Sequence, residues 1–296
     1  MQTKGLSVPG PKLRKENQIR TIHSTLAIEG NTLSLNQITD VLEGKRVRGR
    51  ANEILEVQNA LKLYEQVRKL NPFDLKHFLK AHGILMKGLV NNPGKIRTKN
   101  VGIIKGKKVI HAAPSAKMVS EQMNKLFRWL KADVETHILL KSCIAHYEIE
   151  FIHPFMDGNG RIGRFWQSLI LMELDPVFQY LPMESIIREQ QEEYYQKLRQ
   201  SDKEGASTVF IEFILGVIEQ SLLELIEKSP TTINTQEHRL ELARELFKGK
   251  KFSRKEYMNS MPEISTATAS RDLKIWFDSG YIKRQGERNQ TKYFFV

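Results

Sequence analysis

Residues 153–164, with the sequence HPFMDGNGRIGR, constrain the fold of this chain most strongly. An apolar helical pattern leads up to them, and Pro154 cannot continue that helix because it lacks an N–H and clashes with the preceding turn. Beyond them, apolar residues return at helical spacing, at Ile162, Phe165, Trp166, Leu169 and Ile170. The sequence therefore predicts a helix, a tight loop and a second helix whose N-terminus faces the loop.

A loop of this kind at a helix N-terminus suits a phosphate group. Gly158 and Gly160 let the backbone bend so that successive N–H groups point into one concavity. The free N–H groups and the dipole of the next helix favour an anion at the same place. Arg161 and Arg164 are neighbours on that helix, and their guanidinium groups can hold separate phosphates.

Two other side chains of the stretch supply the chemistry of a group transfer. Asp157 offers a hard carboxylate oxygen, which suits a Mg²⁺ ion held mainly by phosphates. Imidazole titrates close to neutral pH, so His153 can take a proton. Each residue alone is more typical of a helix cap, a turn or a solvated charge. Their combination indicates phosphoryl-type transfer, in which positioning and charge stabilisation do most of the work.

The stretch resembles, without a gap, the signature of the Fic (filamentation-induced-by-cyclic-AMP) family, His-x-Phe-x-Asp/Glu-Gly-Asn-Gly-Arg-x-x-Arg. Most characterised members transfer AMP from ATP to a protein hydroxyl, so the resemblance implies a protein adenylyltransferase. It implies that His153 deprotonates the target hydroxyl, that Phe155 anchors the loop and that Asp157 binds Mg²⁺ on the α- and β-phosphates. It also implies ATP and phosphate contacts from Gly158, Asn159, Gly160, Arg161 and Arg164, the last at the γ-phosphate.

A second resemblance lies near the N-terminus, where a helix is predicted over residues 16–29. Its end, TLAIEG at 25–30, is similar to the inhibitory motif of the Fic family, Ser/Thr-x-x-x-Glu-Gly/Asn. Thr25 and Glu29 share a helix face because they are four residues apart. The resemblance implies that Glu29 pairs with Arg164 and occupies the guanidinium that the γ-phosphate needs. Without it, Glu29 would be an ordinary surface acid.

A β-hairpin is the one clear β element predicted in the first 230 residues. Two segments rich in β-branched residues, at 101–104 and 109–111, flank the polar turn at 105–108. It is either a plain surface hairpin or the flap of Fic proteins, which lies over the active site and binds target peptide by strand addition. The resemblance implies the flap role for Ile103, Ile104, Val109 and Ile110.

Two adjacent tyrosines lie in a helix predicted at about 186–199. The Fic pattern places an adenine contact in this region, so the resemblance implies that Tyr194 or Tyr195 packs on adenine. Packing in the protein core is the alternative for either ring, because aromatic side chains bury large apolar areas.

Residues 236–296 differ in character from the rest. Three short helices are predicted at about 236–248, 253–260 and 265–279, with strands at 281–284 and 292–296. This order resembles a winged helix-turn-helix domain. The small, hydroxyl-rich start of its third helix fits phosphate and groove contact. DNA binding, protein docking and dimerisation all stay open for it.

The expected fold class is mainly α: a Fic-type helical bundle with a small β-hairpin flap, followed by a C-terminal winged helix-turn-helix domain. We expect an N-terminal arm and inhibitory helix region at 1–50, a Fic catalytic helical domain at 51–230 and a winged-helix domain at 236–296. Residues 1–15 are expected to be irregular and residues 229–232 a linker. Further helices are predicted at about 34–43, 51–69, 74–87, 116–131, 136–152 and 207–227.

The composition limits the kinds of binding partner and the cellular compartment that we expect for this chain. The chain is 40% hydrophobic and 27% charged, which is typical of a globular protein. Its formal net charge of +12 favours anionic partners such as nucleotides or nucleic acid. No apolar signal segment or membrane-spanning run is present, so a cytoplasmic protein without a membrane partner is expected. The single cysteine, Cys143, lies in an apolar helix and is predicted to be a core residue.

The leading hypothesis is an autoinhibited protein adenylyltransferase that uses ATP and Mg²⁺ and modifies a target protein and itself. A competing class is a DNA-binding regulator whose Fic domain senses nucleotide with little turnover. A third hypothesis keeps the enzyme but has it transfer UMP, phosphocholine or phosphate, as a few relatives do. The sequence does not identify the target protein, and it leaves a homodimer open.

Overall fold

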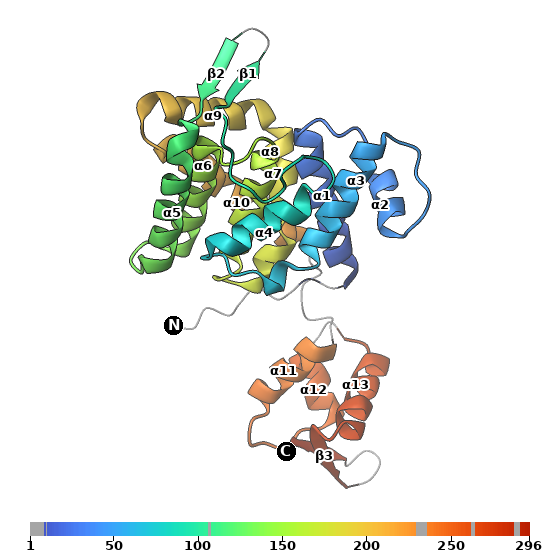
Figure 1. The fold of residues 1–296 in the computed structure, drawn as a ribbon. Coiled ribbons are helices and arrows are strands. Elements are labelled where there is room, and N and C mark those ends of the chain that lie inside the picture. Colours follow the sequence, from blue (N-terminus) through green and yellow to red (C-terminus); the bar gives the residue numbers. More distant parts are fainter. Residues whose placement is uncertain (1–8, 10, 106–107, 229–235, 262–263, 287–290) are drawn as a thin grey trace. The chain divides into compact units, whose positions relative to one another are not determined.

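The computed structural model describes residues 9, 11–105, 108–228, 236–261, 264–286 and 291–296 of the 296-residue chain. The chain divides into two compact units, Met1–Leu225 and Ile226–Val296. Helices dominate both units, as the sequence predicts (Figure 1). None of the helices in the described residues is long and apolar enough to cross a membrane.

Unit 1 is a bundle of helices with one small hairpin among its described residues. Its elements are α1 (Pro11–Ile28), α2 (Leu35–Leu42), α3 (Ala51–Tyr64), the 3₁₀ turn η1 (Val67–Lys69), α4 (Leu75–Leu85), β1 (Gly102–Lys105), β2 (Lys108–Ala112), α5 (Ala116–Ala132), α6 (Ile138–Ile152), α7 (Asn159–Leu171), η2 (Pro176–Tyr180), α8 (Met183–Glu189), α9 (Gln191–Glu204) and α10 (Thr208–Lys228). The last residues of α10 lie beyond Leu225, in the segment assigned to unit 2.

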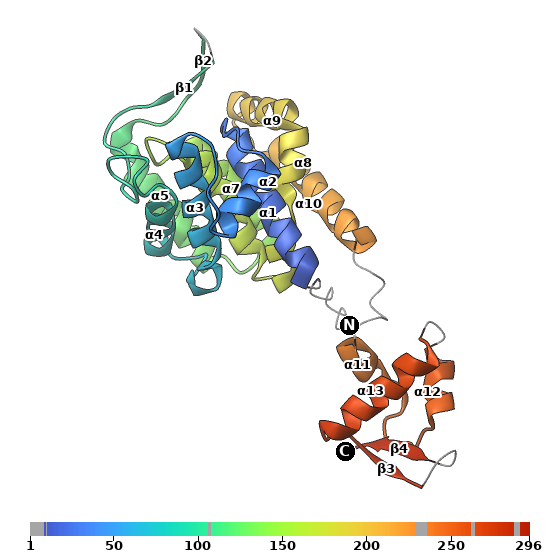
Figure 2. The same ribbon diagram turned by 90° about the vertical axis from the view of Figure 1, so that its right-hand side faces the viewer.

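The helix α7 lies in the middle of this bundle, packed along α6 and in contact with α1 and α4 (Figures 1 and 2). The apolar residues predicted to share its inner face do so, and Trp166 and Ile170 are fully buried. The indole Nε1 of Trp166 donates to Pro72 O at 3.0 Å, so this buried N–H is satisfied. Burial on nearly all sides fixes the N-terminus of α7 in space.

Two apolar clusters fill unit 1, and α1 contributes to both. Ile22 and Leu26 belong to the cluster around α7, whereas Ile28 belongs to a second cluster formed with α8 and α10. The end of α1 is thereby held against the bundle. Cys143 lies fully buried in the second cluster, as predicted, and burial raises the pKa of its thiol to about 12.

The start of α1 differs from the prediction. We expected residues 1–15 to be irregular, but α1 begins at Pro11. Proline is well tolerated at the first position of a helix, because its missing N–H would have no intrahelical partner there. Residues 1–8 and 10 of the expected arm lie outside the described residues.

Two other helices differ in their limits. The helix predicted at 51–69 ends at Tyr64, and η1 follows it. The helix predicted at about 186–199 is two helices, because Gln190 ends α8 and begins α9 with a non-helical ψ of 30°. Periodicity alone does not detect a single residue that changes the direction of the chain.

The predicted β-hairpin is present. Strands β1 and β2 pair antiparallel, with Gly102 opposite Ala112 and Ile104 opposite Val109. The register shifts between Ile103 and Ile104, as at a β-bulge. The hairpin projects from the helical bundle (Figure 2). Residues 106–107 at its tip lie outside the described residues.

After the end of α10, the described residues of unit 2 form three helices followed by two antiparallel strands. They are α11 (Gln236–Leu246), α12 (Arg254–Ser260), α13 (Thr266–Asp278), β3 (Ile282–Gln285) and β4 (Lys292–Phe295). A buried ion pair links the helices: Arg239 donates to both carboxylate oxygens of Asp272, at 2.6 and 2.7 Å. The hydroxyl of Tyr257 donates to the same carboxylate at 2.9 Å. The linker predicted at 229–232 lies outside the described residues.

Candidate active site

The loop between α6 and α7 begins with a left-handed residue. His153 caps α6 with φ of 49°, and it is the only residue other than glycine with positive φ in the described part of the chain. This conformation costs on the order of 1–2 kcal/mol for a residue with a Cβ, so the surroundings must hold it. Its ring Nδ1 lies 3.3 Å from Glu150 O. The loop then leads from His153 into the N-terminus of α7 at Asn159.

Phe155 anchors the loop. Its backbone N–H donates to Asn159 Oδ1 at 2.8 Å, and its carbonyl accepts from Asn159 Nδ2 at 2.9 Å. Its ring is 1% exposed and stacks on His82, with 3.5 Å between ring centroids. The Asn159 side chain therefore closes the loop, in addition to any contact its backbone makes with a phosphate.

His82 supports the loop, a role that the sequence did not indicate. Its Nδ1 accepts from Gly94 N at 2.9 Å, so Nε2 carries the proton and donates to Asp157 O at 2.9 Å. Burial lowers the pKa of His82 to about 4, which keeps the ring neutral. The one signal in the sequence was its position on the apolar face of α4, four residues after Phe78.

A side chain at either loop glycine would meet neighbouring side chains. Gly158 has φ of 82°, and a Cβ there would lie 2.6 Å from Met86 Sδ. A Cβ on Gly160 would overlap the carboxylate of Glu29 and lie 3.0 Å from Arg164 Nη1. The Glu29 carboxylate therefore lies against the first turn of α7, the place where the helix dipole favours an anion.

In the part of the chain that the structure describes, the side chain of Arg164 is bound by Thr25 of α1 and by Glu29 just after this helix. Its Nε donates to Thr25 Oγ1 at 3.0 Å, and its Nη2 donates to Thr25 O at 3.1 Å and to Glu29 Oε1 at 2.7 Å. Its side chain is 2% exposed, whereas that of Glu29 is 29% exposed. Burial opposes the charge, but Glu29, Tyr194 and Glu150 together outweigh this effect and raise the pKa of Arg164. The two residues that the sequence paired are thus in direct contact.

Arg161 has different partners, one of which the sequence did not indicate. Its Nη1 donates to Glu56 Oε1 at 2.7 Å, and its Nη2 donates to Asp157 Oδ1 at 3.1 Å. Its Nε is buried and has no hydrogen-bond partner in the described part of the chain. Glu56, on α3, also accepts from Asn31 Nδ2 at 2.8 Å. Arg161 therefore keeps one buried donor that a phosphate oxygen could satisfy.

Asp157 is the carboxylate best placed for a metal held by phosphates. Its side chain is 59% exposed, and Oδ1 accepts from Gly158 N at 2.6 Å. The described residues contain no group of three or more His, Cys, Asp or Glu that could hold a metal ion. A single exposed carboxylate fits Mg²⁺, which keeps water and phosphate oxygens as most of its ligands, but it does not form an all-protein metal site.

The two tyrosines lie in different environments. Tyr194 is 1% exposed, belongs to the second apolar cluster, and its hydroxyl lies 3.1 Å from His146 Nε2. Of the two roles that the sequence left open, Tyr194 therefore has the role in the core, and its ring is not available to adenine. Tyr195 is partly buried, and its ring packs edge-on against Tyr194 at 5.2 Å between centroids. Burial raises the pKa of Tyr195 to about 12.

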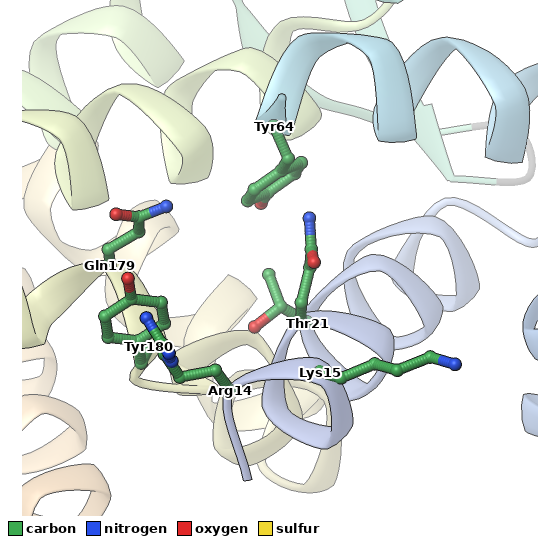
Figure 3. A pocket seen from close by; sticks show the side chains of 7 residues that line it. Arg14, Lys15, Thr21, Tyr64, Gln179 and Tyr180 are labelled. Carbon is green, nitrogen blue, oxygen red and sulfur yellow. The ribbon is translucent and has the colours of Figure 1, made fainter. Parts of the chain in front are cut away.

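A pocket of about 290 Å³ lies on the N-terminal half of α1 (Figure 3). Its walls come from α1, α3 and η2, and it is lined by Arg14, Lys15, Gln18, Thr21, Tyr64, Gln179 and Tyr180. None of these residues belongs to the loop at 153–164. Thr21 is one helical turn from Thr25, so the pocket and Arg164 contact the same helix.

The chain resembles known proteins in sequence. The family model described as Fic/DOC family matches residues 72–171. The protein adenylyltransferase Fic of Culex quinquefasciatus is 32% identical over 222 residues, which make up 71% of this chain and 42% of the relative. That of Nematostella vectensis is 29% identical over 226 residues, 73% of this chain and 50% of the relative. The chain thus spans about half or less of the length of these curated relatives.

Solved structures extend the likeness. A Fic family protein from Desulfovibrio desulfuricans G20 aligns with a TM-score of 0.72 and 38% identity, covering 97% of this chain and 88% of that chain. Fic-1 (residues 134–508) from C. elegans aligns with a TM-score of 0.63 and 24% identity, covering 76% of this chain and 67% of that chain. The likeness to the Desulfovibrio protein spans nearly the whole sequence. The likeness to Fic-1 shows a shared fold only.

Proposed function

The chain belongs to the Fic/DOC family, and from this premise we propose that it is a protein adenylyltransferase that moves AMP from ATP to a hydroxyl side chain of a target protein and of itself. One observation supports the proposal most directly: two buried arginines and the carboxylate of Asp157 lie at the N-terminus of α7, and the loop that leads into this helix carries His153. Such a site can bind a triphosphate and deprotonate a hydroxyl.

In the proposed reaction, His153 takes the proton from the target hydroxyl as its oxygen attacks the α-phosphorus of ATP. The bond from the α-phosphorus to the oxygen that bridges to the β-phosphorus breaks, and pyrophosphate leaves. The N–H groups at the start of α7 and the guanidinium of Arg161 stabilise the charge on the phosphates. Mg²⁺, when bound, would neutralise phosphate charge, and Asp157 is the residue that would hold it.

We further propose that Glu29 restrains this reaction. Arg164 would meet the γ-phosphate, but Thr25 and Glu29 occupy its donors. A carboxylate and a phosphate compete for the same guanidinium and repel each other at close range. ATP therefore either binds with its γ-phosphate displaced or separates Glu29 from Arg164.

The experiment that tests the proposed reaction is an intact-mass measurement after incubation of the chain with ATP and Mg²⁺. The Glu29→Gly chain should gain the mass of AMP. In a parallel reaction with labelled ATP, the protein should acquire label from α-labelled but not from γ-labelled ATP. Transfer of label from γ-labelled ATP alone would instead indicate phosphate transfer. No added mass on this chain or on candidate targets would contradict adenylyltransferase activity.

A second candidate function, DNA binding by unit 2, is favoured by the surface of α13. Ala267, Ser270, Arg271 and Lys274 are exposed at helical spacing, a small and basic stripe of the kind that enters a DNA groove. The one acid between Ser265 and Phe277, Asp272, is buried and paired with Arg239.

The test is a gel shift with duplex DNA at stated salt concentrations, with Arg271→Ala and Lys274→Ala as variants. Weaker binding by both variants, with a smaller salt dependence, would support DNA contact. A chain that binds no DNA but forms dimers in light scattering would assign this surface to protein contact instead.

A further inference from the structure

Arg97, in the segment between α4 and β1, is a buried cation to which no role has been assigned above. It is 3% exposed. Its guanidinium donates to four backbone carbonyls: Nε to His153 O at 2.7 Å, Nη1 to Lys99 O at 3.0 Å, and Nη2 to Pro114 O at 2.6 Å and to Ile152 O at 3.3 Å. These carbonyls come from two different parts of the molecule.

Two of the carbonyls belong to the turn that carries the proposed base. Ile152 ends α6, and His153 is left-handed, so neither carbonyl is bonded within the helix. The backbone N–H of Arg97 also donates to Pro154 O, at 2.9 Å. One residue thus binds three successive carbonyls at this turn and opposes the relaxation of the strained φ at His153.

The other two carbonyls flank the hairpin. Lys99 precedes β1, and Pro114 follows β2. The two ends of the hairpin are also joined directly, because Ala116 N donates to Asn100 Oδ1 at 2.9 Å. The base of the hairpin is therefore closed on itself and bound through Arg97 to the turn at His153.

Only arginine can make this set of contacts. Its planar guanidinium carries five N–H donors in a fixed fork, whereas a lysine ammonium is a compact point charge with three donors. Burial of a charge is costly unless hydrogen bonds replace water, and here the bonds to carbonyls do so. Arg97→Lys keeps the charge but cannot span the turn and both ends of the hairpin.

We propose that Arg97 is a positioning residue that fixes the backbone of His153 and the base of the hairpin relative to each other. A target segment added as a strand to the hairpin would then bring its hydroxyl to the histidine in one register. Misplacement of reacting groups by about 1 Å can cost on the order of 100-fold in rate. The kinetic part of this inference rests on the proposed AMP transfer.

The test uses the full chain with Glu29→Gly as parent, and adds either Arg97→Lys or the control Asn100→Ala. Asn100→Ala removes the bond between the ends of the hairpin and leaves the turn bound to Arg97. Self-modification is followed with α-labelled ATP, and ATP binding by calorimetry. With Arg97→Lys, the rate at saturating ATP should fall by about 10- to 100-fold while ATP affinity stays within about twofold of the parent. With Asn100→Ala, the rate should stay within about threefold.

Hydrogen exchange of backbone amides tests the contact without activity. Arg97→Lys should speed exchange together at the turn after α6 and at the residues that flank the hairpin, whereas Asn100→Ala should speed it only near Ala116. Parent-like exchange at the turn and a parent-like rate with Arg97→Lys would overturn the proposal. If the parent does not transfer AMP, the proposed function fails, and the exchange result still decides the role of Arg97. If Arg97→Lys loses its thermal transition, Arg97→Gln takes its place in both measurements.

Discussion

At the scale of single residues, the two arginines of α7 are both buried but are held differently. Arg164 has its Nε and Nη2 donors bound by Thr25 and Glu29, whereas Arg161 keeps a buried Nε without a partner in the described residues. An unsatisfied buried donor costs about 1–3 kcal/mol, so a phosphate oxygen at Arg161 would relieve a cost. A phosphate at Arg164 would instead have to displace a carboxylate.

His153→Ala should abolish AMP transfer and leave ATP affinity within about twofold, because the ring acts on the attacking hydroxyl and not on the triphosphate. Label transfer and calorimetry on the same preparation measure both quantities. Turnover equal to that of the unmutated chain would remove His153 from the role of base.

Asp157→Ala should weaken Mg²⁺-dependent ATP binding and transfer together, because it removes the exposed carboxylate. Asp157→Asn is the matched control, since its amide oxygen can still accept from Gly158 N while the charge is lost. Both variants should lower ATP affinity in the presence of Mg²⁺ by roughly tenfold and have little effect without it. An unchanged Mg²⁺ dependence of the calorimetric affinity would make the carboxylate structural.

The sequence revealed the candidate site residues more readily than the residues that support them. His153, Asp157 and Arg161 lie in one loop, where a local pattern suffices. Their supports come from distant segments: His82 is 75 residues from Asp157, and Glu56 is 105 residues from Arg161. Helical periodicity relates neighbouring turns only, so it contains no signal for such contacts.

At the scale of elements, α1 supplies hydrogen-bond partners to Arg164 through Thr25. It packs on α8 and contributes to both apolar clusters of unit 1. The N-terminal half of the same helix forms one wall of the pocket in Figure 3. The pocket wall and Thr25, which binds Arg164, therefore belong to one helix.

The contact of α1 with α8 buries an acid, which predicts a pH-dependent stability. Glu184 is 1% exposed, and burial raises its pKa from the ordinary 4.5 to about 7. Its contribution to stability is therefore complete below about pH 4.5 and is lost as the pH rises through about 7.

Glu184→Gln removes this titration with little change of shape. The variant and the unmutated chain should unfold at similar temperatures near pH 5, where the acid is largely protonated in the folded state. Near pH 8 the variant should be more stable by about 1–3 kcal/mol, or a few degrees in Tm. A difference in Tm that does not change between these pH values would contradict the burial of a titrating carboxyl at this contact.

Element positions were predicted better than element ends. The hairpin and the helices on both sides of the loop follow directly from apolar spacing and from glycine and proline. The break at Gln190 and the early start of α1 depend on local caps and on packing against other helices. The spacing of apolar residues along the sequence does not contain this information. Tyr194 lies in the core, where periodicity allowed either of two roles.

At the scale of the whole molecule, the chain consists of two units with separate cores. A chain ending near Thr235 should therefore fold and retain self-modification with the Glu29→Gly change, because it keeps the whole of the first unit. Calorimetry should show one thermal transition for this shortened chain. An insoluble product, or one without a transition, would mean that residues 236–296 belong to the catalytic core.

The most direct test compares initial rates of AMP transfer for four proteins at matched, subsaturating ATP and Mg²⁺: the unmutated chain, Glu29→Gly, Glu29→Gln and Arg164→Ala. A restraint of about 1–3 kcal/mol would hold the unmutated chain about 5- to 150-fold below both Glu29 variants. Arg164→Ala should not reproduce this gain, because it frees the site but removes the γ-phosphate contact. Equal rates for the unmutated chain and both Glu29 variants would contradict the inhibitory role, and no transfer by any of the four would contradict the proposed enzyme.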